Sequence, residues 1–128
     1  MSYYFSKTLS LPFDEAIERT TSVLKDHGFG ILTEIDVRNT LKTKLNVDFR
    51  PYRILGACNP AMAHAALQIE DKIGTMLPCN VVVQEVAPGK TEVAAIDPVA
   101  SMQAVNNERL KETAAAVREK LMQVIQAI

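Results

Sequence analysis

The feature that most constrains the fold is a pair of strand-forming segments joined by a tight turn. Residues 79–86, CNVVVQEV, and residues 91–96, TEVAAI, are rich in residue types that favour extended backbone. Pro88-Gly89 lies between them and is typical of a turn, whereas Asp97-Pro98 is expected to end the second strand and begin a loop. Two strands connected by a short turn run antiparallel. The fold must therefore contain a sheet with at least one antiparallel pair.

Three further strands and four helices are predicted around this hairpin. Aromatic and β-branched residues predict strands over residues 3–9, 29–35 and 52–57. The residues of the second strand that are expected on one face are Phe29, Ile31, Thr33 and Ile35. Apolar residues at helical spacing predict helices from Pro12 to Gly28, after Asp36, over residues 60–71 and over residues 107–127. The order is β-α-β-α-β-α-β-β-α, and its apolar helix faces need a sheet to cover. We expect one α+β domain over residues 1–128, with helices packed on one face of a largely antiparallel sheet.

Length and charge remove several classes of protein. A chain of 128 residues fits one domain, and its net charge of -1 does not suit a protein with a broad basic surface for nucleic acid. No apolar run reaches the roughly 18 residues that a membrane span needs, and the N-terminal segment lacks the pattern of a signal peptide. We therefore expect a soluble cytoplasmic protein that binds neither nucleic acid nor membrane.

The two cysteines lie in similar surroundings. Residues 56–60, GACNP, and residues 77–80, LPCN, both place a Cys-Asn pair beside a proline at the end of a predicted strand. Antiparallel strands would bring both cysteines to the same end of the sheet, whereas parallel strands would hold them a strand length apart. The sequence alone does not decide between these arrangements. Two cysteines are too few for a disulfide scaffold.

Cys58 is the stronger candidate for chemistry. It precedes Asn59 and Pro60, which together predict a helix start, and the N–H groups of a helix start favour a thiolate. Such a thiolate can carry sulfur or attack an electrophile. The alternative is that both cysteines are structural, because free cysteine is among the most buried residue types. His64 is either a proton acceptor for Cys58 or an exposed surface residue.

No metal site and no cofactor are predicted. The sequence has no C-x-x-C pair, and His64 is the only imidazole near a cysteine in the sequence, so the ligand spacing of a zinc site is missing. A glycine-rich phosphate loop and the G-x-S-x-G and H-E-x-x-H motifs are missing too. The sequence favours a binding protein over an enzyme without deciding between them.

Five blocks of residues follow one another in an order that matches a known family. They are GF before a strand ending in EIDV at residues 28–37, TLK at 40–42, LGACNP at 55–60, LPCNVVV at 77–83 and DP at 97–98. The series resembles the bacterial and archaeal family called domain of unknown function 302, over nearly the whole chain. The resemblance implies a TBP-like fold, which is a curved antiparallel sheet with helices on one side, and commonly a homodimer. It also favours antiparallel strands at the two cysteines, and it supplies no reaction.

Three functional hypotheses remain open. The first is a small non-enzymatic binding or accessory domain with a small-molecule ligand in a cleft near the Cys58 and Cys79 segments. Its ligand-binding residues would be Asn59, Pro60, Leu77, Pro78, Asn80, Asp97 and Pro98. The second is a sulfur-carrier or redox protein, with Cys58 as nucleophile, Cys79 as resolving thiol and His64 as proton acceptor. The third is a structural module whose assembly buries a sheet edge.

Overall fold

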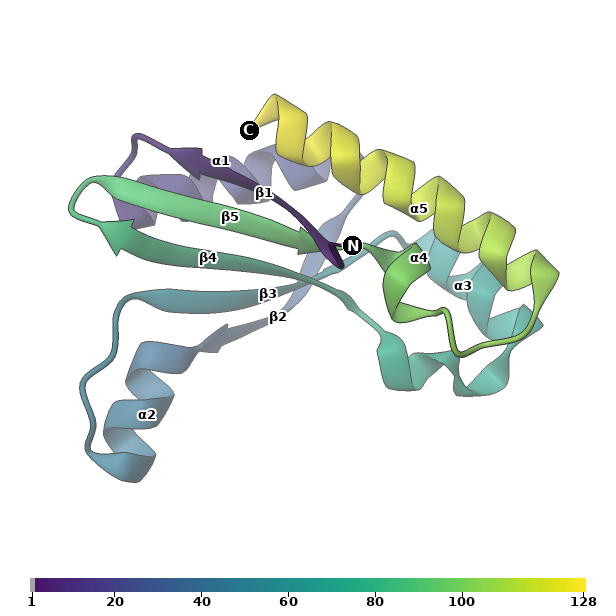
Figure 1. Ribbon diagram of the computed structural model, residues 1–128, viewed down its shortest axis with the longest axis horizontal. Coiled ribbons are helices and arrows are strands. Elements are labelled where there is room, and N and C mark those ends of the chain that lie inside the picture. Colours follow the sequence, from purple (N-terminus) through teal and green to yellow (C-terminus); the bar gives the residue numbers. More distant parts are fainter. Residues whose placement is uncertain (1) are drawn as a thin grey trace.

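A five-stranded sheet with helices against one face forms the frame of the protein (Figure 1). The structure, a computed structural model, describes residues 2–128. The strands are β1 (Tyr4–Leu9), β2 (Gly30–Asp36), β3 (Tyr52–Cys58), β4 (Cys79–Ala87) and β5 (Lys90–Ile96). The helices are α1 (Phe13–Asp26), α2 (Val37–Leu45), α3 (Pro60–Ile69), the 3-10 helix η1 (Asp71–Met76), α4 (Pro98–Ser101) and α5 (Glu108–Ala127). The predicted α+β class is confirmed.

The sheet is open, and every neighbouring pair of strands in it is antiparallel. Its strand order is β1-β5-β4-β3-β2, so the predicted hairpin of β4 and β5 lies near the centre. In the pairing of β3 with β4, Ala57 lies opposite Cys79. The end of β3 and the start of β4 are therefore at the same end of the sheet. Of the two arrangements that the sequence left open, the antiparallel one is confirmed.

The main hydrophobic core lies between this sheet, α1 and α5. Every second residue of the central strands faces the helices, as the pleat of a strand requires. The fully buried members from the strands are Leu55, Ala57, Val81, Val83, Val93 and Ala95, and those from the helices are Ala16, Leu24, Leu121 and Val124. Lys7 connects β1 to the C-terminal end of α5, because its Nζ atom donates a hydrogen bond to the carbonyl oxygen of Ile128 at 2.8 Å.

A second hydrophobic cluster lies apart from the main core. It is made by α3, η1, α4 and the N-terminal half of α5, on the right of Figure 1. Its buried members are Ala66, Ile73, Met102, Leu110 and Ala114. The sequence predicts neither η1 nor α4, and Asp97-Pro98 predicts the start of a loop there. In fact Asp97 caps α4 by accepting a hydrogen bond from the N–H of Val99 at 3.0 Å. A helix of four residues is too short to show a helical period.

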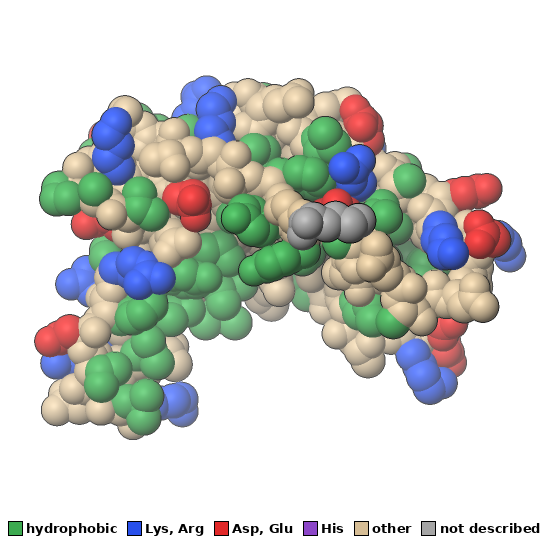
Figure 2. Space-filling view, viewed as in Figure 1, with side chains coloured by type: hydrophobic (Ala, Val, Ile, Leu, Met, Phe, Trp, Pro, Cys, Tyr) green, Lys and Arg blue, Asp and Glu red, His purple; other side chains and the backbone are tan. Residues whose placement is uncertain are grey.

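Among residues 2–128, no helix packs across the centre of the sheet face that points away from α1 and α5. We call it the open face, and its central row is Ser6, Ala94, Val82, Ile54 and Ile35. Figure 2 shows the molecule hollowed there, with hydrophobic side chains gathered in the hollow between α2 and η1. Helix α2 projects beside this hollow and has no buried residue.

The prediction that Thr33 and Ile35 share a face with Phe29 and Ile31 is wrong, because Thr33 and Ile35 lie on the open face. A bulge between Ile31 and Thr33 shifts the register of β2, so that Ile31 pairs with Ala57 on the helix side, whereas Ile35 pairs with Ile54 on the open face. Ile35 is 49% exposed as a result. A strict alternation over residues 29–35 cannot survive one extra residue in the strand.

Gly56 allows the two strand ends to approach closely, and we expect Gly56→Ala to destabilise the fold by roughly 1–3 kcal/mol. A Cβ atom there would overlap Oγ1 of Thr33 and lie 2.7 Å from Cγ of Pro78. Urea unfolding measures the loss. Gly30→Ala is the matched control on the adjacent strand, because a Cβ atom at Gly30 meets nothing within 4 Å.

Adding Thr33→Ala to Gly56→Ala removes the nearer obstacle, so the double variant should recover part of the lost stability. Equal stabilities for Gly56→Ala and Gly30→Ala would show that the approach of Thr33 and Pro78 does not constrain β3.

Candidate functional site

A cavity of about 310 Å³ lies at the end of the sheet where β3 ends and β4 begins. Its walls come from both hydrophobic clusters: Ala57 and Val117 adjoin the main core, and Met102 and Leu110 belong to the second cluster. Helix α3 and the segment before β4 complete it. Its size is in the range of sites for small molecules. The cavity therefore lies between the sheet and the layer made by α3, η1 and α4.

Asn59 connects the end of β3 to this cavity. Its Oδ1 atom accepts a hydrogen bond from the N–H of Met62 at 3.2 Å, so it is the N-cap of α3, as predicted, and Pro60 is the first helical residue. Asn59 also lies against Gly28, in the turn after α1. The φ of +86° and the missing side chain of Gly28 allow this turn to approach Asn59, because a Cβ atom there would be 3.2 Å from Nδ2 of Asn59. No atom of residues 2–128 accepts a hydrogen bond from that Nδ2.

The two Cys-Asn segments touch each other at the cavity. Pro78 packs over the backbone of Gly56, and the Leu77–Pro78 peptide bond is cis. Cys58 and Cys79 both line the cavity as free thiols. Together with Met62 and Met102, they place four sulfur-containing side chains around one space.

The two thiols differ in their surroundings. Cys58 is partly exposed, whereas Cys79 is only 8% exposed. Burial, and to a smaller extent the nearby Cys58, raises the pKa of Cys79 to about 11. Cys79 is therefore an uncharged thiol at neutral pH, and it is a poor nucleophile there because the thiolate is the reactive form.

The structure brings some of the predicted site residues together and separates others. Asn59, Leu77, Pro78 and Pro98 line the cavity with both cysteines. Pro60 is exposed at the start of α3, outside the lining, and Asn80 lies on the open face beside Val82. His64 is exposed on α3, with its ring 3.3 Å from Nε2 of Gln68, and it does not line the cavity.

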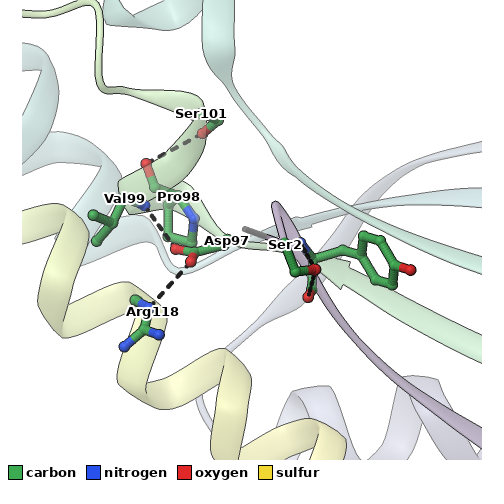
Figure 3. A network of polar contacts seen from close by, with 7 residues as sticks. Ser2, Asp97, Pro98, Val99, Ser101 and Arg118 are labelled. Carbon is green, nitrogen blue, oxygen red and sulfur yellow. Dashed lines mark hydrogen bonds and ion pairs between the residues drawn. The ribbon is translucent and has the colours of Figure 1, made fainter.

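Asp97 holds secondary structure elements together at one side of the cavity (Figure 3). Its Oδ1 atom caps α4, and its Oδ2 atom accepts a hydrogen bond from Nε of Arg118 on α5 at 3.1 Å. Its backbone N–H donates to the carbonyl oxygen of Tyr3 at 2.8 Å. The Asp97 residue is 8% exposed, and its charge is paired with Arg118. Asp97 therefore positions α4, and Met102, the residue after α4, lines the cavity.

Several lining residues belong to the apolar face of the helix predicted over residues 107–127, and the sequence predicts that this face packs against the sheet. Leu110, Ala114 and Val117 belong to the apolar stripe of α5, and that stripe gave no sign that part of it faces a cavity. Phe29 was read only as a strand residue. The helical period says which side of a helix is apolar, and it says nothing of how tightly the opposite wall packs.

The described residues contain neither a metal-binding cluster nor a membrane-spanning helix. Within residues 2–128, no three His, Cys, Asp or Glu side chains lie together as a metal ion requires. No helix of the described chain has the length and apolar character to cross a membrane.

Comparisons with known proteins agree on one family. The model of the family described as "Domain of unknown function DUF302" matches residues 5–128. The crystal structure of the uncharacterized conserved protein DUF302 from Bacillus stearothermophilus superposes with a TM-score of 0.90, at 31% sequence identity, over 98% of each chain. No curated protein matches the sequence.

The buried Cys79 thiol should make the fold less stable in alkali. Unfolding returns the pKa from about 11 towards 9.0, so the unfolded chain loses this proton first and stability falls as pH rises from 9 to 11. The expected loss is roughly 2 kcal/mol by pH 11. The measurement is the free energy of urea unfolding against pH, for the wild type and for Cys79→Ala.

Cys79→Ala should lack this part of the loss, while Cys58→Ala should keep most of it, because burial is the larger cause of the raised pKa. Identical pH profiles for the wild type and Cys79→Ala would contradict the prediction.

Proposed function

The chain belongs to the family of domain of unknown function DUF302, and on that premise we propose that it is a small binding protein whose ligand occupies the cavity between β3, α3 and α5. Its role is to hold a small, mainly apolar molecule, without catalysing a reaction. The two free thiols suit the reducing conditions of the cytoplasm, where we place the protein.

The observation that carries this proposal is the cavity of about 310 Å³ with its apolar walls. Protein interiors are close-packed, and a void deprives the atoms around it of dispersion contacts. A ligand that fills the space restores those contacts and buries its own apolar surface, at about 25 cal/mol per Å². The walls come from two separate clusters, so one ligand would contact both.

Filling the cavity from its own wall should weaken binding. Ala63 lines the cavity on α3, and Ala63→Leu adds three carbons that take the place of ligand carbons. Each buried carbon is worth about 0.8 kcal/mol, so the affinity should fall by about tenfold or more. The probe is N-phenyl-1-naphthylamine, an uncharged dye whose fluorescence rises in apolar surroundings.

Ala65→Leu is the control, because Ala65 is on the same helix, exposed and outside the lining. It should bind the dye as the wild type does. Equal dye affinity in Ala63→Leu and Ala65→Leu would place the dye elsewhere and count against the cavity as the binding site.

A thiol-dependent function is the second candidate, because both cysteines line the same cavity. Cys58 would be the nucleophile or sulfur carrier. The high pKa of Cys79 speaks against its role as a resolving thiol, since few thiolates form at neutral pH. The exposed position of His64, outside the lining, removes the support for a nearby proton acceptor. We therefore place ligand binding first.

We further propose that the chain forms a homodimer through the open face. Ala94, Val82 and Ile54 run across its three central strands, and Tyr4 and Tyr52 lie beside them. A sheet with an apolar row on each face is stable when both faces are covered. A second copy of the chain would cover the open face by an isologous contact.

A charge in the centre of the open face should separate such a dimer. We expect Val82→Glu to be monomeric in sedimentation velocity, because the interface would bury an unpaired carboxylate. Ala116→Glu places the same charge on the exposed side of α5 and should leave the dimer intact. A monomeric wild type, or a dimeric Val82→Glu, would contradict the proposed interface.

A further inference from the structure

We propose that Asn59 orients the ligand by donating a hydrogen bond from Nδ2 to a carbonyl oxygen, so that the cavity takes a neutral, mainly apolar carbonyl compound. This inference rests on the proposed function, and it adds the chemical class of the ligand and the residue that recognises it.

The first support is that the two polar atoms of the Asn59 side chain have different roles. Its Oδ1 atom is committed to the N–H of Met62 at the start of α3, which also fixes the amide plane and identifies the other atom as the donor. The two N–H bonds of Nδ2 have no acceptor among residues 2–128. Asn59 lines the cavity, so a ligand oxygen is an acceptor that this donor lacks.

The second support is the chemistry of the other walls. None of the described residues that line the cavity is Asp, Glu, Lys, Arg or His. A charged ligand would lose water there without gaining a partner of opposite charge, which disfavours carboxylates and amines. The hydroxyl of Thr113, the other polar group besides the thiols, is within hydrogen-bond distance of the carbonyl oxygen of Arg109, at 3.4 Å. Asn59 thus brings the one strong donor left without a partner among the described lining residues.

The third support is the rigidity of the donor. The backbone of Asn59 lies between the end of β3 and the fixed first turn at Pro60, and its amide packs against Gly28. A donor held in this way loses little freedom when a ligand binds, so its hydrogen bond discriminates well between ligands. Shape and apolar contact would come from the rest of the wall.

The experiment compares acetophenone with ethylbenzene, which has nearly the same shape and no acceptor. Asn59→Asp keeps the N-cap, because an aspartate oxygen accepts from Met62 equally well, and it removes the N–H donors. Affinities for both compounds are measured by NMR titration of the wild type and of this variant. Asn106→Asp is the control for the added charge, because Asn106 is exposed and outside the lining.

We expect Asn59→Asp to weaken acetophenone binding by roughly threefold to tenfold more than it weakens ethylbenzene binding, the worth of one neutral hydrogen bond. Asn106→Asp should not change the ratio of the two affinities. The carbonyl carbon of ¹³C-labelled acetophenone should resonate further downfield when bound to the wild type than when bound to Asn59→Asp, because only the wild type donates a hydrogen bond from Nδ2 to the carbonyl oxygen. Benzoate should bind the wild type more weakly than acetophenone.

Two results separate the failure of this inference from the failure of the proposed function. If both compounds bind and Asn59→Asp weakens them equally, or if benzoate binds as tightly as acetophenone, the cavity binds apolar ligands without the recognition proposed for Asn59. If neither compound shifts the resonances of lining residues in the wild type, the cavity is not a binding site and both proposals are overturned.

Discussion

The rest of the site depends on the absence of a side chain at Gly56. Thr33 from β2 and Pro78 from the segment before β4 both pack against the backbone of this residue, where no other amino acid would fit without displacing them. The contact joins the end of β3 to the approach of β4, and so it holds the two Cys-Asn segments together. Helix α3 follows β3, and η1 leads into β4. The cavity is the space between α3, η1 and α5.

Signals that act over a few residues predicted most of this fold. The helix starts after Asp36 and at Asn59-Pro60, and the turn at Pro88-Gly89, appear where the sequence predicts them, because each depends only on neighbouring residues. The prediction for Ile35 failed because a bulge is a property of two paired strands, and the sequence of one strand does not reveal it. The cavity was beyond reach for the same reason. A leucine on an apolar helix face looks the same whether the opposite wall touches it or stands away. The sequence drew attention to the right end of the sheet through the two cysteines, and it could not say which neighbours would line the space.

The cavity is lined by uncharged, mainly apolar side chains. Burial keeps Cys79 protonated, the ion pair of Asp97 and Arg118 lies to one side as part of the framework, and the lining is mainly apolar. Asn59 serves the fold with one atom of its amide and, on our proposal, the ligand with the other. Because Asn59 also caps α3, the fold itself holds the hydrogen-bond donor in position before a ligand binds.

The separation of the two hydrophobic clusters has a consequence for cooperativity. Helix α5 runs through both, but α3, η1 and α4 meet the sheet mainly across the cavity. Two clusters that pack separately can each act as a local unfolding unit with its own free energy of opening. A ligand that touches both walls couples the two units into one transition, and it raises the stability of the layer by the free energy of binding. On our proposal, the bound ligand would then complete the interior of the protein.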